Sequence, residues 1–91
     1  MQPTITHQPD QHRFVAELDG ARGNLAYELG DGLMTITHTH VASELEGRGV
    51  GAALVEAALD LARRQGLKVR PVCSYANAYM KKHPEADKLR A

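Results

Sequence analysis

The first 41 residues alternate between apolar and polar side chains with the two-residue period of half-buried strands. The alternation is plainest at three apolar positions, which are Phe14, Ala16 and Leu18. We predict four strands, over residues 4–7, 14–19, 23–29 and 33–41, the last of them rich in β-branched residues. Asp19-Gly20 and Asp31-Gly32 separate the last three, and Asp-Gly is a strong signal for a tight hairpin turn. The sequence therefore predicts antiparallel strands joined by hairpins.

Beyond these strands the period changes to that of a helix. Apolar residues then recur every three or four positions and form one stripe on a helix, consisting of Val50, Leu54, Ala57, Ala58, Leu61 and Ala62. Gly66 stands where a C-terminal cap is expected. The pattern predicts one amphipathic helix that begins close to Val50 and ends before Gly66.

A final alternating run, residues 67–70, predicts one more strand. Pro71 has no N–H to donate, so this strand must lie at an edge of the sheet or separate from its neighbour there. Ser74 is predicted to cap a last helix that runs to Lys82 and is stopped by Pro84. The predicted fold is a single domain, residues 1–91, of the α/β (α+β) class. Its mixed sheet has antiparallel N-terminal strands followed by a βαβ unit and a C-terminal helix.

Composition and charge narrow the classes of function. The net charge is zero and only 4% of the residues are aromatic, which argues against a nucleic-acid-binding surface. Residues 46–91 nevertheless hold nine basic and five acidic side chains. This basic half either attracts an anionic ligand or is an ordinary solvated surface. Cys73 is the single cysteine, which excludes an internal disulfide. Without a signal sequence or an apolar run of spanning length, we expect a cytoplasmic protein with no membrane contact.

Three glycines alternate in the segment Gly47-Arg48-Gly49-Val50-Gly51, directly before the predicted helix. Glycines allow the backbone to approach a ligand closely, and a helix N-terminus offers unpaired N–H groups to a phosphate. Arg48 would add a cation. The alternative is a flexible turn. The P-loop pattern does not fit because Ala52-Ala53 follow the last glycine, and the spacing of the glycines differs from the dinucleotide fingerprint.

The segment from Thr39 to Leu54 resembles the acetyl-CoA-binding segment of the GNAT N-acetyltransferases, which is a strand followed by Gln/Arg-x-x-Gly-x-Gly/Ala and a helix. Gly49 and Gly51 match the last two positions, and Glu46 stands where the family has Gln or Arg. A short branch of the superfamily, called YjdJ-like, has a His-Thr-x-Val strand end, then the glycine loop, and then Cys-Ser-Tyr after the following strand. This chain has the same features in the same order, as His38-Thr39-His40-Val41, the glycine loop and Cys73-Ser74-Tyr75. The similarity extends from Ile5 to Leu89.

The resemblance implies acetyl-CoA or coenzyme A as the cofactor, with its pantetheine arm in a gap between the last two strands. Carried over by position, the cofactor-binding residues are Val41, Glu46, Gly47, Arg48, Gly49, Val50, Gly51, Ala52, Cys73 and Tyr79. The catalytic candidates are His38, His40, Cys73 and Tyr75. In the family a backbone N–H at the end of the strand before the loop stabilises the oxyanion, and this position falls near Val41.

The catalytic candidates each have a structural alternative. His40 would deprotonate the amine, with His38 on the same strand face, or both are simply exposed strand residues. A His-x-His pair is also half of a metal site, but no third ligand is evident and no metal is expected. Cys73 would line the pantetheine channel, donate a proton to the thiolate or accept the acetyl group. The structural alternative is that Cys73 is a small buried hydrophobic residue. The tyrosine acid of larger members aligns with Met80, beside Tyr79.

The sequence thus predicts an acetyl-CoA-dependent N-acyltransferase that acts on a primary amine of a small molecule or a protein. The chain lacks the segments from which larger members build the acceptor site. We therefore expect this site to be open, or completed by a second copy or a partner protein. Two alternatives stay open. One is a non-catalytic CoA or acyl-CoA-binding module, and the other is an interaction domain that uses the basic C-terminal half.

Overall fold

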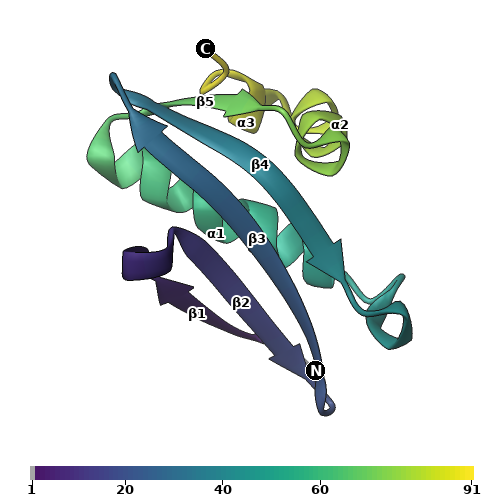
Figure 1. The fold of residues 1–91 in the computed structure, drawn as a ribbon. Coiled ribbons are helices and arrows are strands. Elements are labelled where there is room, and N and C mark those ends of the chain that lie inside the picture. Colours follow the sequence, from purple (N-terminus) through teal and green to yellow (C-terminus); the bar gives the residue numbers. More distant parts are fainter. Residues whose placement is uncertain (1) are drawn as a thin grey trace.

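The computed structural model describes residues 2–91 as one five-stranded sheet with its strands in chain order (Figure 1). The strands are β1 (Thr4–Gln8), β2 (Arg13–Leu18), β3 (Ala21–Gly30), β4 (Leu33–Val41) and β5 (Lys68–Pro71). The first four pair antiparallel, and β4 and β5 pair parallel. The remaining elements are η1 (Pro9–Gln11), η2 (Ser43–Leu45), α1 (Val50–Gln65), α2 (Ser74–Lys82) and α3 (Pro84–Asp87). The predicted fold class is confirmed.

Both predicted Asp-Gly hairpins are present. Asp19 and Gly20 have φ angles of 52° and 80°, and Asp31 and Gly32 have 55° and 73°. Two consecutive positive φ angles define the type I′ turn, whose twist matches that of the flanking strands. The turns set the register of β2, β3 and β4, so the apolar positions of all three strands face the same way.

Helix α1 covers one face of the sheet and contacts all five strands (Figure 1). The predicted stripe is buried except for Ala57, and Val55 and Leu59 widen it. Gly66 adopts the left-handed conformation (φ 68°) and ends the helix as predicted. The core between α1 and the sheet contains no buried polar or charged residue among those the structure describes.

A β-bulge at Thr37 changes the facing of β4. His38 pairs with Ala26 and Ile36 pairs with Tyr27, so Thr37 has no partner of its own on β3. The Thr37 hydroxyl donates to the Ala26 carbonyl at 3.3 Å and helps to hold the bulge. One extra residue reverses the alternation of side chains. The inward-facing positions are therefore Met34 and Ile36 before the bulge, and Thr39 and Val41 after it.

Strand β5 separates from β4 at Pro71, as the missing N–H predicted. Pro71 pairs with Ile36, and then the N–H groups of Val72 and Cys73 both donate to the Ile36 carbonyl, at 3.1 and 3.0 Å. The chain turns away there into α2. The last five residues of β4, 37–41, have no strand partner on this side among the described residues.

Two details of the C-terminal segment differ from the prediction. The N-cap of α2 is Cys73 rather than Ser74, and it makes no side-chain capping bond, so the helix begins one residue earlier than predicted. Pro84 does end α2, but it also opens the short helix α3. Beyond α3 the Val69 N–H donates to the Leu89 carbonyl at 2.7 Å and the Ala91 N–H to the Val69 carbonyl at 2.9 Å. These bonds cover the outer edge of β5.

Candidate active site

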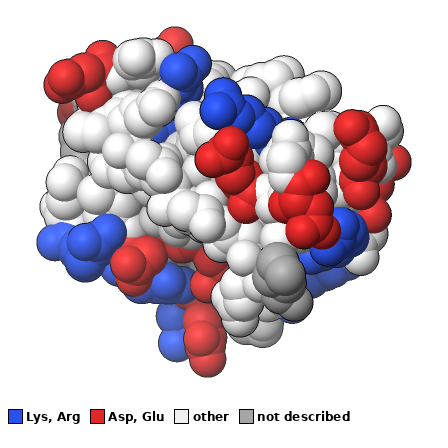
Figure 2. All heavy atoms as spheres, turned by 90° about the horizontal axis from the view of Figure 1, so that it is seen from below, with Lys and Arg blue, Asp and Glu red and all other residues white. Residues whose placement is uncertain are grey.

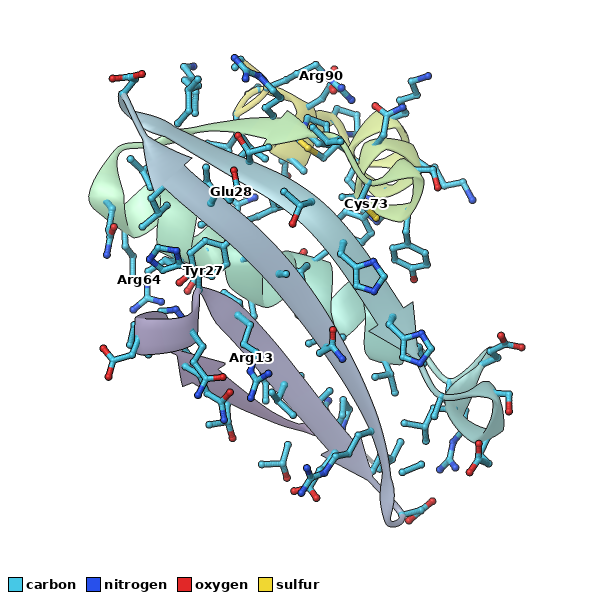
Figure 3. All side chains as sticks on the ribbon, in the orientation of Figure 1. Arg13, Tyr27, Glu28, Arg64, Cys73 and Arg90 are labelled. Carbon is cyan, nitrogen blue, oxygen red and sulfur yellow. The ribbon has the colours of Figure 1, made fainter. Side chains whose placement is uncertain are left out.

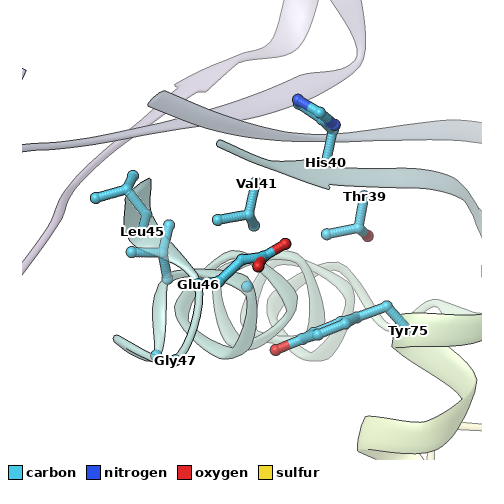
Figure 4. Close-up of a pocket in the computed structure, with 10 residues that line it drawn as sticks. Thr39, His40, Val41, Leu45, Glu46, Gly47 and Tyr75 are labelled. Atoms are coloured by element: carbon cyan, nitrogen blue, oxygen red, sulfur yellow. The ribbon is translucent and has the colours of Figure 1, made fainter. Parts of the chain in front are cut away.

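A cavity of about 560 Å³ lies between the end of β4, the glycine loop and the first residues of α2 (Figure 4). We call it the loop cavity. Its lining residues come from three segments distant in sequence and are Thr39, His40, Val41, Leu45, Glu46, Gly47, Gly49, Val50, Gly51 and Tyr75. The volume is in the range of small-molecule sites. Most of the predicted cofactor loop is thus brought together here with two of the predicted catalytic residues, His40 and Tyr75. Thr39 and Leu45 are the lining residues that the sequence did not single out.

The glycine loop presents free backbone donors to the loop cavity. Gly47 and Gly49 have φ angles of 78° and 80°, in the region that favours glycine. Gly49 is the N-cap of α1, and the first helical bond runs from the Ala53 N–H to the Gly49 carbonyl at 3.0 Å. Among the described residues, the N–H groups of residues 50–52 have no acceptor. This arrangement is suited to a phosphate or another anion, because a helix N-terminus is a ready anion site.

Gly51 allows Tyr75 to lie against the helix. A Cβ on Gly51 would come within 2.7 Å of both the Tyr75 Cζ and its hydroxyl oxygen. Gly51 itself is buried, whereas the Tyr75 side chain is 44% exposed. The ring therefore forms a wall of the loop cavity over the first turn of α1, and its outer surface stays open to solvent (Figure 4).

Of the two charged side chains beside the loop, Arg48 and Glu46, Arg48 lies elsewhere than the sequence predicted. Arg48 was expected beside the diphosphate, but its guanidinium donates to Asp19 at 2.8 Å, on the β2–β3 hairpin. Arg48 is not among the residues that line the cavity. Glu46 does line it, and its carboxylate points into the space between β4 and Tyr75 (Figure 4). Sequence reasoning could not foresee the Arg48–Asp19 pair because a hairpin 29 residues away supplies the partner.

Two backbone N–H groups at the end of β4 point toward the gap that β5 leaves. The Ala42 N–H donates to the Arg22 carbonyl at 3.0 Å, so it points toward β3. Successive N–H groups of a strand alternate in direction, so those of Val41 and Thr39 point the other way. The Val41 N–H therefore points into the gap, and its role as the oxyanion donor stays a prediction.

The Cys73 thiol lies at the junction of β5 and α2 (Figure 3). Its Sγ donates to the Thr39 Oγ1 at 3.5 Å. Burial raises the pKa of the Cys73 thiol, but hydrogen bonds with Thr39 and with the backbone of Ala76 and Tyr75 outweigh burial and lower the pKa below its ordinary value. Cys73 is half-buried and borders the gap, although it does not line the loop cavity.

The imidazoles of His38 and His40 lie on the other face of the sheet. The rings stack with centroids 6.3 Å apart, and both side chains are exposed. They share one face as predicted, but because of the bulge at Thr37 this face points away from Tyr75 and the glycine loop. Figure 4 shows the ring of His40 above β4 and Thr39 below it. His40 thus borders the loop cavity while its ring points outward, and its role as a base stays a prediction.

Tyr79 and Met80 are both occupied by structural contacts. Met80 is fully buried in the core and is not available as an acid. The Tyr79 hydroxyl donates to Glu56 at 2.6 Å, and burial together with this carboxylate raises the pKa of Tyr79 to about 12. Tyr79 lines a second cavity, of about 350 Å³, instead of the first. We call it the Tyr79 cavity, and its lining residues are Ala52, Tyr75, Ala78, Tyr79, Lys82 and His83.

A family model described as GCN5-related N-acetyl-transferase matches residues 13–89. The chain belongs to the GCN5-related N-acetyltransferase family. The match includes the end of β4, the glycine loop and α2, so the loop cavity is built from residues within the family domain. The predicted family is confirmed, and the name of the short branch stays a prediction.

Curated relatives resemble this chain over most of its length. Protein NATD1 of Gallus gallus is 32% identical over 83 residues, which are 88% of this chain and 76% of that protein. Protein NATD1 of Homo sapiens is also 32% identical over 83 residues, covering 88% and 74%.

Two solved structures share the fold. The solution NMR structure of a GCN5-like protein from Staphylococcus aureus matches with a TM-score of 0.77 and 28% sequence identity, over 97% of this chain and 87% of that one. The IAA acetyltransferase from Bacillus cereus matches with a TM-score of 0.62 and 26% identity. That match covers 77% of this chain and 51% of the enzyme, which is a much longer protein.

Surface features add little to this family assignment. On the face that Figure 2 shows, basic and acidic side chains are interspersed. None of the helices within residues 2–91 has the length and apolar character needed to cross a membrane. Over the same residues there is no cluster of three or more side chains suited to a metal ion, so His38 and His40 have no third ligand there.

Proposed function

We propose that this GCN5-related N-acetyltransferase binds acetyl-CoA in the loop cavity and transfers its acetyl group to a primary amine of a small molecule or a protein. The observation that carries the proposal is the separation of β5 from β4 after Ile36. The resulting gap leads directly to the free N–H groups at the start of α1. A long thioester arm fits the gap, and a diphosphate fits the helix end.

The backbone carries most of the proposed binding. The N–H groups of residues 50–52 would hold the diphosphate, and the positive φ angles of Gly47 and Gly49 shape the loop around it. Glu46 is the one carboxylate in this lining, and we expect it to weaken anion binding rather than to help it. The inward side chains of Thr39 and Val41 would contact the pantetheine arm.

For the transfer step, bound acetyl-CoA supplies a thioester that a neutral amine attacks. The Val41 N–H would donate to the thioester oxygen as negative charge develops there. A single preorganised donor of this kind contributes about 2.7–4 kcal/mol in other acyl-transfer enzymes. The Tyr75 hydroxyl, which lines the loop cavity, or the Cys73 thiol, which borders the gap, would give a proton to the departing sulfur. An amine arriving from the outer face of the sheet would meet His40 as its base.

The second candidate is a CoA or acyl-CoA-binding module without turnover. The contacts of α2 favour it, because Met80 is buried and the Tyr79 hydroxyl is held by Glu56. The helix position used as the acid in larger family members therefore supplies no proton donor to the loop cavity. The two functions share the same binding site and differ only in product formation.

Isothermal titration with acetyl-CoA and CoA, with ATP and NAD as controls, tests the binding step. We expect both CoA species to bind and the controls not to bind. Release of free CoA thiol in the presence of a panel of primary amines then separates the transferase from the binding module. A folded protein that binds neither CoA species would remove the proposal in both forms.

The acceptor site is proposed to be open, or completed by a second copy or another protein. His38 and His40 lie on the exposed outer face of β4, so this face is accessible to a large acceptor such as a protein chain. Sedimentation velocity with and without acetyl-CoA would show whether two copies associate. A strict monomer that acetylates small amines would rule out the need for a partner.

A further inference from the structure

The two edges of the sheet differ in what covers them. The outer edge of β5 is covered, because Val69 exchanges backbone hydrogen bonds with Leu89 and Ala91 of the C-terminal segment. Strand β1 forms the opposite edge and pairs with β2 alone (Figure 1). Within residues 2–91, no backbone group bonds to β1 from its outer side. An open strand edge of this kind is a template on which another strand can pair.

The hydrogen-bond ladder decides which backbone groups β1 presents to solvent. The Tyr27 N–H donates to the His12 carbonyl at 3.0 Å, in line with the β2–β3 register. Because bonded pairs alternate along antiparallel strands, the odd-numbered residues of β2 direct their backbone groups toward β1. Their partners in β1 are its even-numbered residues. The N–H and C=O groups of Ile5 and His7 therefore point outward, away from the sheet.

Strand β1 lacks the features that usually keep an edge strand from pairing. Its sequence, Thr-Ile-Thr-His-Gln, contains no lysine, no carboxylate and no proline, and its pairing with β2 has no bulge. Arg64 of α1 is close enough to His7 to lower the pKa of His7, and Arg64 is itself paired with Asp60 at 3.3 Å. Neither the strand nor this ion pair therefore repels a second copy of the same edge.

Two prolines restrict how such an edge can pair with a copy of itself. Pro3 and Pro9 are the next odd-numbered residues on either side of the strand, and neither has an N–H to donate. The outward donors of β1 are thus Ile5 and His7. Antiparallel pairing centred on Thr6 sets Ile5 of each copy against His7 of the other. In this register both outward N–H groups of each strand find carbonyl acceptors within the opposite strand.

We propose that β1 is a self-association edge, on which a second copy of this chain pairs antiparallel around Thr6 and continues the sheet. The added strand would cover the side chain of Ile5, which is only half-buried although it packs against the core. A strand of five residues is a short interface, so we expect a reversible dimer that depends on protein concentration. β1 contributes no residue to the lining of the loop cavity, so the proposal is independent of the proposed function.

Sedimentation velocity of the full chain at increasing concentration tests the proposal, for the wild type, Thr6→Lys, Thr6→Glu and Thr4→Lys. The Thr6 side chain is exposed and would lie directly opposite its own copy, where like charges destabilise the pairing. Thr4→Lys is the matched control, because Thr4 is an exposed threonine of the same strand that would lie opposite Gln8 instead.

We expect the wild type and Thr4→Lys to associate with similar dissociation constants. Thr6→Lys and Thr6→Glu, each alone, should raise the dissociation constant about fivefold, the size expected for one like-charge pair across two strands. An equimolar mixture of the two Thr6 variants should associate at least as tightly as the wild type, because opposite charges then face each other.

Every outcome decides the proposal. A wild type that stays monomeric overturns it and shows that a second copy is not what pairs with β1. Equal weakening in Thr6→Lys and Thr4→Lys is a general effect of added charge and also overturns it. A mixture of the two Thr6 variants that associates no better than either alone refutes the pairing around Thr6. Both threonines are exposed, so circular dichroism is expected to show an unchanged fold for each variant. Titration with CoA, which reports on the loop cavity, is expected to give the same result for all four proteins.

Discussion

The ring of Tyr75 occupies the space that a side chain on Gly51 would need. A Cβ at Gly51 would lie 2.7 Å from the Tyr75 Cζ, a distance that real contacts do not tolerate. Tyr75 is in α2 and Gly51 is in the first turn of α1, so this contact, together with the Tyr79–Glu56 hydrogen bond, holds the two helices against each other. Gly51 thus serves the packing of Tyr75 as well as the approach of a ligand.

The Gly51→Ala substitution should therefore change stability differently in two backgrounds. With Tyr75→Ala already present, alanine should raise the free energy of unfolding by up to about 1 kcal/mol, because it is a better helix former than glycine. In the wild type this gain should vanish, because the Tyr75 ring must move. Urea unfolding of the four variants of this double-mutant cycle measures the difference. Equal gains in the free energy of unfolding in both backgrounds would show that the Tyr75 ring moves aside at no cost in stability.

Gly49→Glu should abolish the binding of CoA. Gly49 has a φ of 80°, and a carboxylate at the N-cap of α1 would compete with the diphosphate for the same N–H groups. The left-handed conformation costs a non-glycine residue about 1–2 kcal/mol, so the variant should be less stable but folded. Gly30→Glu is the matched control, since Gly30 has a negative φ and open space around it. Titration with CoA that gave the same affinity for Gly49→Glu and wild type would refute the loop as the diphosphate site.

The Cys73 thiol should titrate below the ordinary value of a cysteine. Burial raises the pKa of Cys73. The hydrogen bonds with Thr39 and with the backbone of α2 lower the pKa by more than this, so the net shift is downward. Thr39→Val removes the hydroxyl, so the pKa should rise and alkylation by iodoacetamide near neutral pH should slow. Thr37→Val is the control because the Thr37 hydroxyl bonds to the Ala26 carbonyl instead. The pH dependence of the alkylation rate, recorded for all three proteins, gives the pKa directly. If the pH dependence of alkylation were the same in Thr39→Val as in the wild type, the Thr39 hydroxyl would have no part in lowering the pKa of Cys73.

Stability should fall as the pH drops below about 6.5, the ordinary pKa of histidine. Burial and then the charge of Arg64 lower the pKa of His7, whose Nε2 lies 2.6 Å from the Tyr27 hydroxyl. Between the lowered pKa and the ordinary one the unfolded chain binds more protons than the folded chain, so protonation favours unfolding. Urea unfolding at pH 5.5 and 7.5 should show a smaller difference for His7→Gln than for the wild type. The exposed His38→Gln variant should behave like the wild type.

Local signals in the sequence were sufficient for the strands, the hairpins and α1. Asp-Gly pairs fix the turns through their positive φ angles, and Pro71 marks where β5 leaves the sheet because it cannot donate to the ladder. These features depend on residues close together in the chain. The glycine loop was predictable to the same extent, because its glycines and the start of α1 are consecutive.

The parts of the site that were missed depend on contacts between distant segments. Arg48 was expected to serve the ligand, but the β2–β3 hairpin brings Asp19 to it. The Tyr79 hydroxyl was expected at the cofactor, but α1 supplies Glu56 as its partner. Thr39 was part of a motif without a role of its own, and only the turn of the chain after β5 places it against Cys73. A pattern along the chain carries no information about such partners.

The bulge at Thr37 divides β4 into two segments of opposite phase. Before it, substitutions at even-numbered positions such as Met34 and Ile36 affect the core, and odd-numbered positions tolerate change. After it, the odd-numbered positions Thr39 and Val41 face inward and the even ones face solvent. The alternation between positions that tolerate substitution and positions that do not therefore shifts by one residue at Thr37. Deleting Thr37 would make Ile36 and His38 neighbours in the strand, so β4 could pair with β3 without the bulge while Thr39 and Val41 still faced inward.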